Sequence, residues 1–280
     1  MWDNQEDTML SVMTLNLRFG LADDGPNSWE YRKKALTSLF AEYPADFIGF
    51  QEANDFQIKF LKTVLPEHNI IGKRKPAPYF WQNNIIFYKN TWESVFYEHF
   101  FLSPTPTIPS RSRKSKWPRQ CTMGIFKKNG LELICINTHF DFDASVQAES
   151  AGIIMDRLFN MPQKTPAILL GDFNTTPNSS SYKMFTGHDQ NIRPTKLDQN
   201  IRPAKLDQNI RPKKLYFQNV FKNHYPGTHH GFTGNQNGGH IDWILYRGRL
   251  EVKDKRVITD SFNKIYPSDH FPVYATFKWQ

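Results

Sequence analysis

The sequence predicts an α+β fold in which two β-sheets pack face to face and helices cover their outer faces. Short apolar runs of strand length recur in both halves of the 280-residue chain, and only a few segments repeat their apolar residues with helical spacing. Aromatic residues make up 15% of the chain, and aromatic rings pack well on half-buried pleated surfaces. The length and composition suit one large globular domain over residues 1–280.

In the first half of the chain, residues 9–17 form a short apolar run that indicates a buried strand. Asn27 followed by Glu30 fits a capping box, and a helix with one apolar face is expected over residues 29–43. A strand over residues 46–51 and a helix over residues 55–65, which ends before a proline, follow.

In the second half, Asn129-Gly130 is a strong two-residue turn signal and predicts a hairpin between strands at residues 121–126 and 131–138. A helix is expected over residues 144–160. The remaining predicted strands are residues 84–88, 92–101, 167–171, 241–246, 253–259 and 272–278, and residues 103–118 are expected to form a surface loop.

The chain has two cysteines, Cys121 and Cys135, both in apolar runs. Two cysteines make neither a disulfide scaffold nor a zinc cluster, so we expect buried free thiols. The first residues do not form a secretory signal, and no apolar run is long enough to span a membrane. A cytoplasmic protein with no transmembrane segment is therefore expected, and nothing indicates an obligatory protein partner.

A nonapeptide, DQNIRPxKL, occurs three times in succession over residues 189–215. Three short copies with one proline each cannot build a core, so we interpret the segment as a surface insertion within the domain. It carries +4 of the formal net charge of +8. A tolerated loop expansion is the simpler interpretation, and a basic clamp on a polyanion is the alternative.

Polar side chains recur at the ends of predicted strands, where a rigid scaffold could position them. Each has an ordinary structural explanation alone. A carboxylate such as Glu52 after an apolar strand needs a cation, a donor or water, and hard oxygen ligands suit Mg²⁺. Asp172 and Asn174, two residues apart, can face one pocket, and Asp242 on an apolar strand could orient a histidine. The set comprises Asn16, Gln51-Glu52, residues 137–141, residues 171–174, residues 241–243 and residues 267–270.

Taken in order, these segments resemble the endonuclease/exonuclease/phosphatase superfamily, from about Met13 to Phe277 and without the repeat. The matching text includes NLRF, FIGFQEA, NTHFD, GDFNTTP, IDWILYR and YPSDHFPV, which is most similar to a largely bacterial, poorly characterised branch. The resemblance implies a four-layered α/β/β/α sandwich of two mixed sheets, like that of pancreatic-type deoxyribonucleases. It also implies a metal-dependent phosphoesterase that uses Mg²⁺, with Mn²⁺ as a substitute.

The resemblance implies a role for each matching residue. Glu52 would be the main Mg²⁺ ligand, and Asp269 would contribute to the metal site. Asp172 would activate the attacking water, Asn174 and Asn16 would hold phosphate oxygens and the carboxylate geometry, and His139 and His270 would donate to the phosphate. Asp242 would orient His270, and Asp141 is a weaker supporting residue.

Four further residues lie near these motifs or differ from the family pattern. Arg119 could contact a phosphate, or be an ordinary loop arginine. His240 stands where the family often has Arg or Lys, and it is expected at the surface. Trp29 and Arg32 could form part of a substrate wall, although Trp29 could equally belong to the core.

The basic charge and the aromatic content favour a nucleic acid or nucleotide phosphoester as substrate, and hence a nuclease or phosphodiesterase. The alternative enzyme is a phosphatase or sphingomyelinase-like phospholipase acting on a small or lipid phosphoester. The alternative of another class is a non-catalytic nucleic-acid-binding module. Its weakness is that a binding module needs basic side chains rather than this set of acids.

Overall fold

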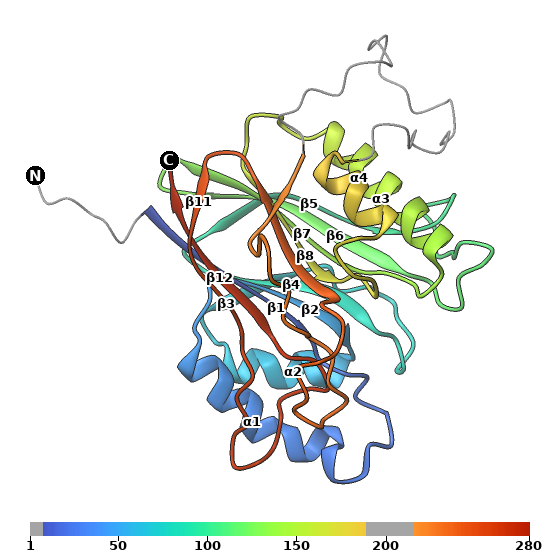
Figure 1. The fold of residues 1–280 in the computed structure, drawn as a ribbon, viewed down its shortest axis with the longest axis vertical. Coiled ribbons are helices and arrows are strands. Elements are labelled where there is room, and N and C mark those ends of the chain that lie inside the picture. Colours follow the sequence, from blue (N-terminus) through green and yellow to red (C-terminus); the bar gives the residue numbers. More distant parts are fainter. Residues whose placement is uncertain (1–7, 189–215) are drawn as a thin grey trace, which may run out of the picture.

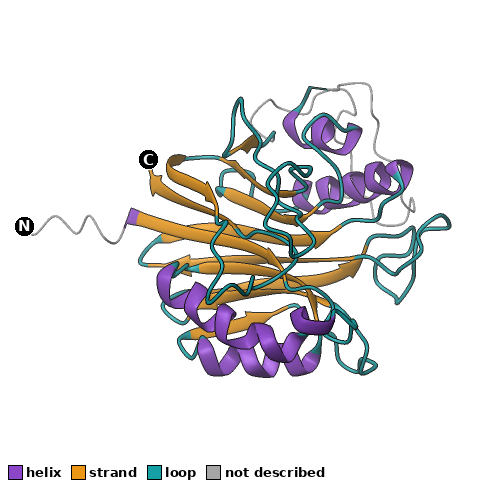
Figure 2. Cartoon of the chain, turned by 60° about the horizontal axis from the view of Figure 1, so that its bottom comes forward, coloured by secondary structure: helices purple, strands orange, loops and turns teal. Residues whose placement is uncertain are grey.

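In a computed structural model, which describes residues 8–188 and 216–280, two six-stranded sheets pack face to face. Helices lie on the outer side of each sheet, and the layers are visible in two orientations (Figure 1, Figure 2). The predicted four-layered α/β/β/α fold is therefore confirmed. The repeat predicted as an insertion at residues 189–215 lies outside the described residues.

The first sheet has one parallel pair, β1 and β2, and its other neighbours are antiparallel. Helices α1 (Trp29–Glu42) and α2 (Asp55–Val64) cover it. In spatial order its strands are β11 (Leu250–Val257), β12 (Val273–Trp279), β1 (Met9–Asn16), β2 (Phe47–Ala53), β4 (Asn83–Lys89) and β3 (His68–Ile71).

The second sheet also has one parallel pair, β7 and β8, among antiparallel neighbours. Helices α3 (Ala144–Phe159) and α4 (Ser180–Thr186) cover it. In spatial order its strands are β5 (Glu93–Phe101), β6 (Gln120–Lys128), β7 (Leu131–His139), β8 (Ala167–Asp172), β10 (Asp242–Arg247) and β9 (Gln218–Asn219).

Apolar side chains form three buried layers because the central strands are covered on both faces. In β8, Leu169 faces the helices, whereas Ile168 and Leu170 face the other sheet. Successive side chains of a strand point to opposite faces, so a strand buried on both sides is a continuous apolar run. The two predicted free thiols follow the same rule, since buried Cys121 packs in the helix layer and buried Cys135 between the sheets.

Most predicted element ends agree with the structure to within one or two residues, but the predicted capping box of the first helix is wrong. Gly25–Asn27 forms a short 3-10 helix, η2, and α1 begins at Trp29, as predicted, after Ser28, which makes no side-chain cap hydrogen bond. The capping box instead begins α2, where the Asn54 side chain and Gln57 hydrogen bond reciprocally to the backbone.

The hairpin predicted at Asn129-Gly130 is confirmed. Both residues have positive φ angles, 48° and 81°, as a two-residue turn between twisted strands requires. The sequence did not predict β3, β9 or α4, which are four, two and seven residues long and carry a weak periodic signal.

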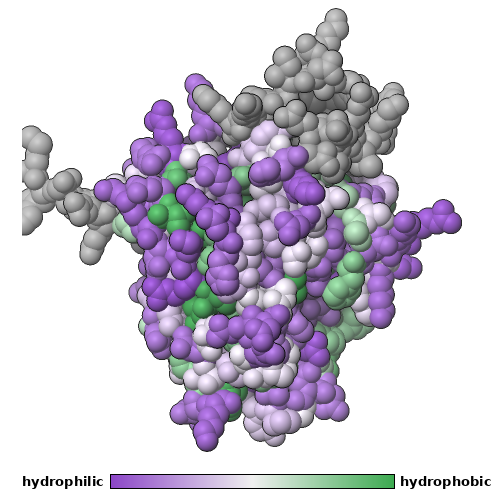
Figure 3. Space-filling view, viewed as in Figure 1, coloured by the Kyte–Doolittle hydropathy of each residue, from purple (hydrophilic) through white to green (hydrophobic). Residues whose placement is uncertain are grey.

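The described part of the face drawn in Figure 3 is largely hydrophilic, with hydrophobic residues showing in small separate areas. Within residues 8–188 and 216–280, no helix has the length and apolar character needed to cross a membrane.

Candidate active site

The predicted site residues meet at one end of the two sheets because of strand direction and register. The carboxyl ends of parallel β7 and β8 lie together, with His139 in register with Asp172. Asp172 is in register with Asp242, the first residue of antiparallel β10. Asn16 ends β1 in the opposite sheet, and its side chain contacts Asp172, so the site lies where the two sheets meet.

Asn16 joins two carboxylates that are far apart in the sequence. Its Nδ2 donates to Asp172 Oδ2 at 2.9 Å and approaches Glu52 Oε1 at 3.2 Å. Its Oδ1 accepts the backbone N–H of Arg18 at 2.9 Å, which fixes the orientation of the amide. The buried Asn16 therefore holds Glu52 and Asp172 on either side of one NH₂ group.

Glu52 is directed into the site by an irregularity at the end of β2. The pairing of β2 with β4 shifts between Phe50 and Ala53, and Glu52 has a φ of 58° in the left-handed region. Such a bulge re-aims a side chain. The backbone N–H of Phe19 then donates to Glu52 Oε2 at 2.6 Å, so both carboxylate oxygens are positioned.

Asp172 is a buried carboxyl group with a raised pKa. Burial, followed by the negative charge of Asp242, raises the pKa of Asp172 to about 7. The backbone N–H of Asn174 donates to its Oδ1 at 2.9 Å. The preceding Gly171 has a φ of 146°, and a Cβ there would lie 2.0 Å from the carbonyl oxygen of Thr138. Only glycine lets the two strands approach this closely beside the site.

His270 and Asp242 form a buried ion pair. His270 Nδ1 lies 2.8 Å from Asp242 Oδ2, and His270 Nε2 lies 3.9 Å from Asp172 Oδ2. Burial lowers the pKa of His270, but the carboxylates of Asp242 and Asp172 outweigh it and raise the pKa to about 10. His270 is therefore a cation at neutral pH, with Nδ1 directed to Asp242 and Nε2 toward the pocket.

His139 differs from His270 in charge. Burial, followed by the positive charges of Arg119 and His270, keeps the pKa of His139 well below its usual value. Its Nε2 lies 3.0 Å from Asn174 Nδ2 and 3.4 Å from Asp172 Oδ2. Asn174 also donates to the Phe140 carbonyl at 2.9 Å, which holds its amide in place. His139 is thus a neutral hydrogen-bonding group beside Asp172.

Asp269 lies next to His270 and is positioned by its neighbour. Ser268 Oγ donates to the Asn16 carbonyl at 2.5 Å and lies 3.1 Å from Asp269 Oδ1. Asp269 Oδ2 lies 3.7 Å from Arg18 Nε, which also interacts electrostatically with Glu52. The cationic side chain of Arg18 is therefore near both predicted metal ligands.

Arg119 is nearly buried beside the site, 8% exposed, rather than a solvated loop arginine. Its Nε lies 3.7 Å from Asp141 Oδ2, beyond hydrogen-bond distance, and has no hydrogen-bond partner among the described residues. Asp141 instead accepts from Ser115 Oγ at 2.7 Å, so it supports the loop that precedes Arg119. Arg119 thus offers a donor to an anion in the pocket.

Several supporting residues were not predicted as such. Gln51 Nε2 donates to Asn137 Oδ1 at 2.7 Å across the two sheets, and Asn137 Nδ2 donates to the Phe50 carbonyl at 2.9 Å. The absence of a side chain at Gly49 makes room for Asn137, because a Cβ there would lie 3.0 Å from its amide. This buried network joins the strands that carry Glu52 and His139. In the sequence, Gln51 and Asn137 are recognisable as polar residues within otherwise apolar strands.

Trp29 and Arg32, which could have formed part of a substrate wall, are both buried instead. Trp29 is 3% exposed and packs in the core beside α1. Arg32 is fully buried, and its Nη1 donates to the carbonyls of Leu17 at 2.9 Å and Pro267 at 2.7 Å. Arg32 therefore joins the loop after β1 to the loop that carries Asp269, and it does not line a substrate wall.

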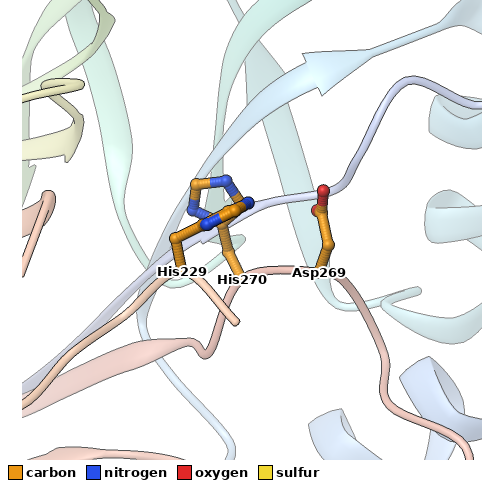
Figure 4. A group of neighbouring side chains, drawn as sticks. All are labelled: His229, Asp269 and His270. Carbon is orange, nitrogen blue, oxygen red and sulfur yellow. The ribbon is translucent and has the colours of Figure 1, made fainter. Parts of the chain in front are cut away.

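Two histidines near the site, His240 and His229, differ in exposure. His240 was predicted at the surface, and this is wrong: it is 2% exposed, and its Nδ1 lies 2.7 Å from the Pro226 carbonyl. His229, which the sequence did not single out, is exposed beside His270, with ring centroids 4.8 Å apart. Figure 4 shows the ring of His229 extending across the front of His270 toward the carboxylate of Asp269.

Two groups of side chains in the described ranges have metal-ligand atoms within 4.8 Å of one another. One is Asp172, Asp242 and His270, all buried, and the other is His229, Asp269 and His270. Glu52 belongs to neither group, although Asn16 places it beside Asp172. Asp242 Oδ1 is buried without a hydrogen-bond partner among the described residues. The site thus has several carboxylate oxygens that could bind a cation.

The model of the endonuclease/exonuclease/phosphatase family matches residues 13–270. A family protein of Bacteroides thetaiotaomicron is 26% identical with a TM-score of 0.80, covering 98% of each chain. The mannosyl-6-phosphatase of the same organism is also 26% identical with a TM-score of 0.80, covering 96% of this chain and 100% of its own.

A truncated TDP2 of Caenorhabditis elegans shares the fold at 16% identity and a TM-score of 0.70, covering 99% of this chain and 100% of its own. No curated protein matches the sequence.

Proposed function

Because the chain belongs to the endonuclease/exonuclease/phosphatase family and is therefore a hydrolase of phosphate esters, we propose that its substrate is a small phosphate monoester, with a sugar phosphate as first candidate. The observation that carries the proposal is the pairing of a buried carboxyl base, Asp172, with a cationic donor, His270. The likeness to a mannosyl-6-phosphatase at 26% identity supports the substrate class.

The proposed cofactor is Mg²⁺, with Mn²⁺ as a substitute. Glu52 and Asp269 would hold it, since both carboxylates interact with Arg18 and carboxylate oxygens are the ligands that Mg²⁺ prefers. The unsatisfied buried Asp242 Oδ1 also fits a pocket that receives positive charge. When bound, the ion would neutralise charge on the phosphate, which otherwise repels an attacking oxygen.

Asp172 is the proposed general base. A base is most effective when its pKa lies near the working pH, and the pKa of Asp172 is raised to about 7. The hydrogen bonds from Asn16 to Oδ2 and from the Asn174 backbone to Oδ1 hold the carboxylate in one orientation. In that orientation Asp172 would position a water molecule and accept its proton during attack on phosphorus.

His270 and Arg119 are the proposed donors to the phosphate oxygens, and His139 is a neutral imidazole that lies beside them. His270 keeps its charge because Asp242 accepts from Nδ1, which leaves Nε2–H for the substrate. Arg119 brings a buried guanidinium, and Asn174 positions His139. Preorganised donors of this kind stabilise the negative charge that grows in the transition state.

A nucleotide or nucleic acid remains the second candidate substrate. The observation that favours it is a pair of exposed aromatic side chains near Arg119: Trp117 is 53% exposed and Phe142 is 69% exposed. The guanidinium carbon of Arg119 lies 5.7 Å from the Phe142 ring centroid, and Lys116 Nζ lies 5.4 Å from that of Trp117. Exposed rings beside cations can stack bases and bind their phosphates.

A substrate panel tests the proposal. Purified protein with Mg²⁺ or EDTA is incubated with mannose 6-phosphate, other sugar phosphates, nucleotides, labelled DNA and RNA, and sphingomyelin. We expect Mg²⁺-dependent release of inorganic phosphate from a sugar phosphate, and loss of that release in Asp172→Asn but not in the exposed control Asp254→Asn. Cleavage of DNA or RNA without phosphate release from any monoester would contradict the monoester proposal and favour the second candidate.

A further inference from the structure

His229, Asp269 and His270 together have the composition of a transition-metal site. Their ligand atoms all lie within 4.8 Å of one another, and the three side chains stand next to each other in Figure 4. We propose that they form a second cation site, which takes a Zn²⁺-like ion and, when filled, inhibits Mg²⁺-dependent hydrolysis. The inhibitory part rests on the role proposed for His270 in hydrolysis.

The backbone holds the two segments that carry these ligands against each other. The N–H groups of His230 and Gly231 donate to the Asp269 carbonyl at 2.9 and 3.0 Å. The N–H of Phe271 donates to the Thr228 carbonyl at 2.7 Å, and His229 pairs with His270 in an isolated β-bridge. Backbone hydrogen bonds therefore hold the two ligand-bearing segments together, so the ligands do not lie on independent loops.

The available ligand atoms suit an ion with three protein ligands. Asp242 occupies His270 Nδ1 and leaves Nε2, an arrangement that commonly orients a metal-bound imidazole. Asp269 Oδ2 lies 3.7 Å from Arg18 Nε and so makes no hydrogen bond with it. His229 is exposed to solvent. Two atoms that bind one ion at about 2.1 Å are at most about 4.2 Å apart, so shifts below about 1 Å suffice.

The chemical types of the ligand atoms determine which class of metal ion the site prefers. Two imidazole nitrogens and one carboxylate oxygen form a set that zinc enzymes use, with a fourth position open to water or a phosphate oxygen. Mg²⁺ prefers oxygen donors, whereas imidazole suits Zn²⁺, Co²⁺ and Ni²⁺. The nitrogen donor added by His229 therefore distinguishes this site from the carboxylate pocket at Glu52.

Sharing Asp269 and His270 makes the two uses of the site exclusive, because Asp269 is also a proposed Mg²⁺ ligand. An ion on His270 Nε2 displaces the proton from that nitrogen to solvent. In the proposed hydrolysis, the same Nε2–H donates a hydrogen bond to a phosphate oxygen. A bound transition ion would thus remove the His270 donor and one proposed Mg²⁺ ligand, Asp269, from the hydrolytic site, while leaving Glu52 and Asp172 in place.

Cobalt binding tests the site without any assay of turnover. Co²⁺ is titrated into the full-length protein and into His229→Ala, His229→Asp and His224→Ala, and its visible absorption is followed. We expect one saturable site in the wild type and in His224→Ala, an exposed histidine of the same loop. Affinity should fall at least tenfold in His229→Ala and recover in part in His229→Asp, which restores a ligand. Equal cobalt affinity of His229→Ala and the wild type would overturn the site.

Zinc inhibition tests the consequence. Phosphate release with excess Mg²⁺ is measured against Zn²⁺, and each variant is compared with its own zinc-free rate. The half-inhibitory Zn²⁺ concentration should rise at least tenfold in His229→Ala and stay unchanged in His224→Ala. Equal inhibition of both variants would overturn the inhibitory role. If no substrate is hydrolysed at all, the proposed function fails, and the cobalt titration still decides the site.

Discussion

The substitution Asp242→Asn keeps the shape of the side chain that holds His270 but removes its negative charge. In the native protein, Asp242 Oδ2 lies 2.8 Å from His270 Nδ1, and both residues are buried. Asn can still accept a hydrogen bond through its amide oxygen. The variant therefore separates the charge of Asp242 from the space that it fills.

The size of the effect follows from the charge balance around His270. Burial lowers the pKa of His270, and the carboxylates of Asp242 and Asp172 together raise it to about 10. Loss of one carboxylate should lower that pKa by roughly 2 units, which corresponds to roughly 3 kcal/mol. With a pKa of about 8 His270 would still be mostly protonated at pH 7, so kcat there should fall only by roughly tenfold, from the weaker hydrogen bond that orients the ring, and the loss should grow as the pH rises above about 8.

The pKa of His270 in Asp242→Asn can be measured by NMR titration of the Mg²⁺-free protein, and kcat by phosphate release at pH 7. Asp254→Asn on the exposed strand β11 provides a control with the same change of charge. Thermal unfolding should show that both variants are folded. A pKa within half a unit of the wild-type value, together with a kcat within threefold, would refute the role given to the ion pair.

Three further predictions concern stability and substrate binding. Gly171→Ala should cost roughly 3 kcal/mol or more in urea unfolding, because its Cβ would lie 2.0 Å from a backbone oxygen. Gly130→Ala, also at positive φ but in open space, should cost only about 1 kcal/mol. Burial, followed by the charge of Arg74, lowers the pKa of His99 to about 4. Between about pH 4 and 6.5 the unfolded chain therefore binds more protons than the folded protein. Stability should therefore fall as pH drops through that window, by at most about 3 kcal/mol, and His99→Gln should lessen the fall. Arg119→Ala should lower kcat/KM by roughly 10- to 100-fold, as expected for loss of a charged hydrogen bond, with Arg119→Lys less affected.

Each of these expectations has a contrary outcome. Equal unfolding free energies for Gly171→Ala and Gly130→Ala would show that the strands separate easily beside the site. An unchanged pH dependence in His99→Gln would assign the acid sensitivity to other groups. Unchanged kcat/KM in Arg119→Ala would remove Arg119 from substrate binding.

The sequence predicted the fold well where the signal was local. The apolar run before His139 and the turn at Asn129-Gly130 both appear as expected. The site prediction depended on the order of several motifs, because Asn16 and Asp172 meet only through the packing of two sheets.

What the sequence could not predict depends on contacts between distant segments. Arg32 is buried because it hydrogen bonds to two loop carbonyls that no local pattern connects to it. His240 is buried by packing against Phe221 and Tyr225, although a histidine among glycines and asparagines is typical of a surface loop. His229 lies beside the site only because its loop pairs with the segment around His270.

Mg²⁺-dependent phosphate release by Asp172→Asn and Glu52→Gln, measured over a range of Mg²⁺ concentrations, tests the central claim most directly. If one pocket combines a base with an ion held on carboxylates, Asp172→Asn should lose at least about a thousandfold in kcat. Glu52→Gln should need much more Mg²⁺ to reach its own maximal rate. Folded variants that match the wild type in kcat and in Mg²⁺ dependence would contradict it.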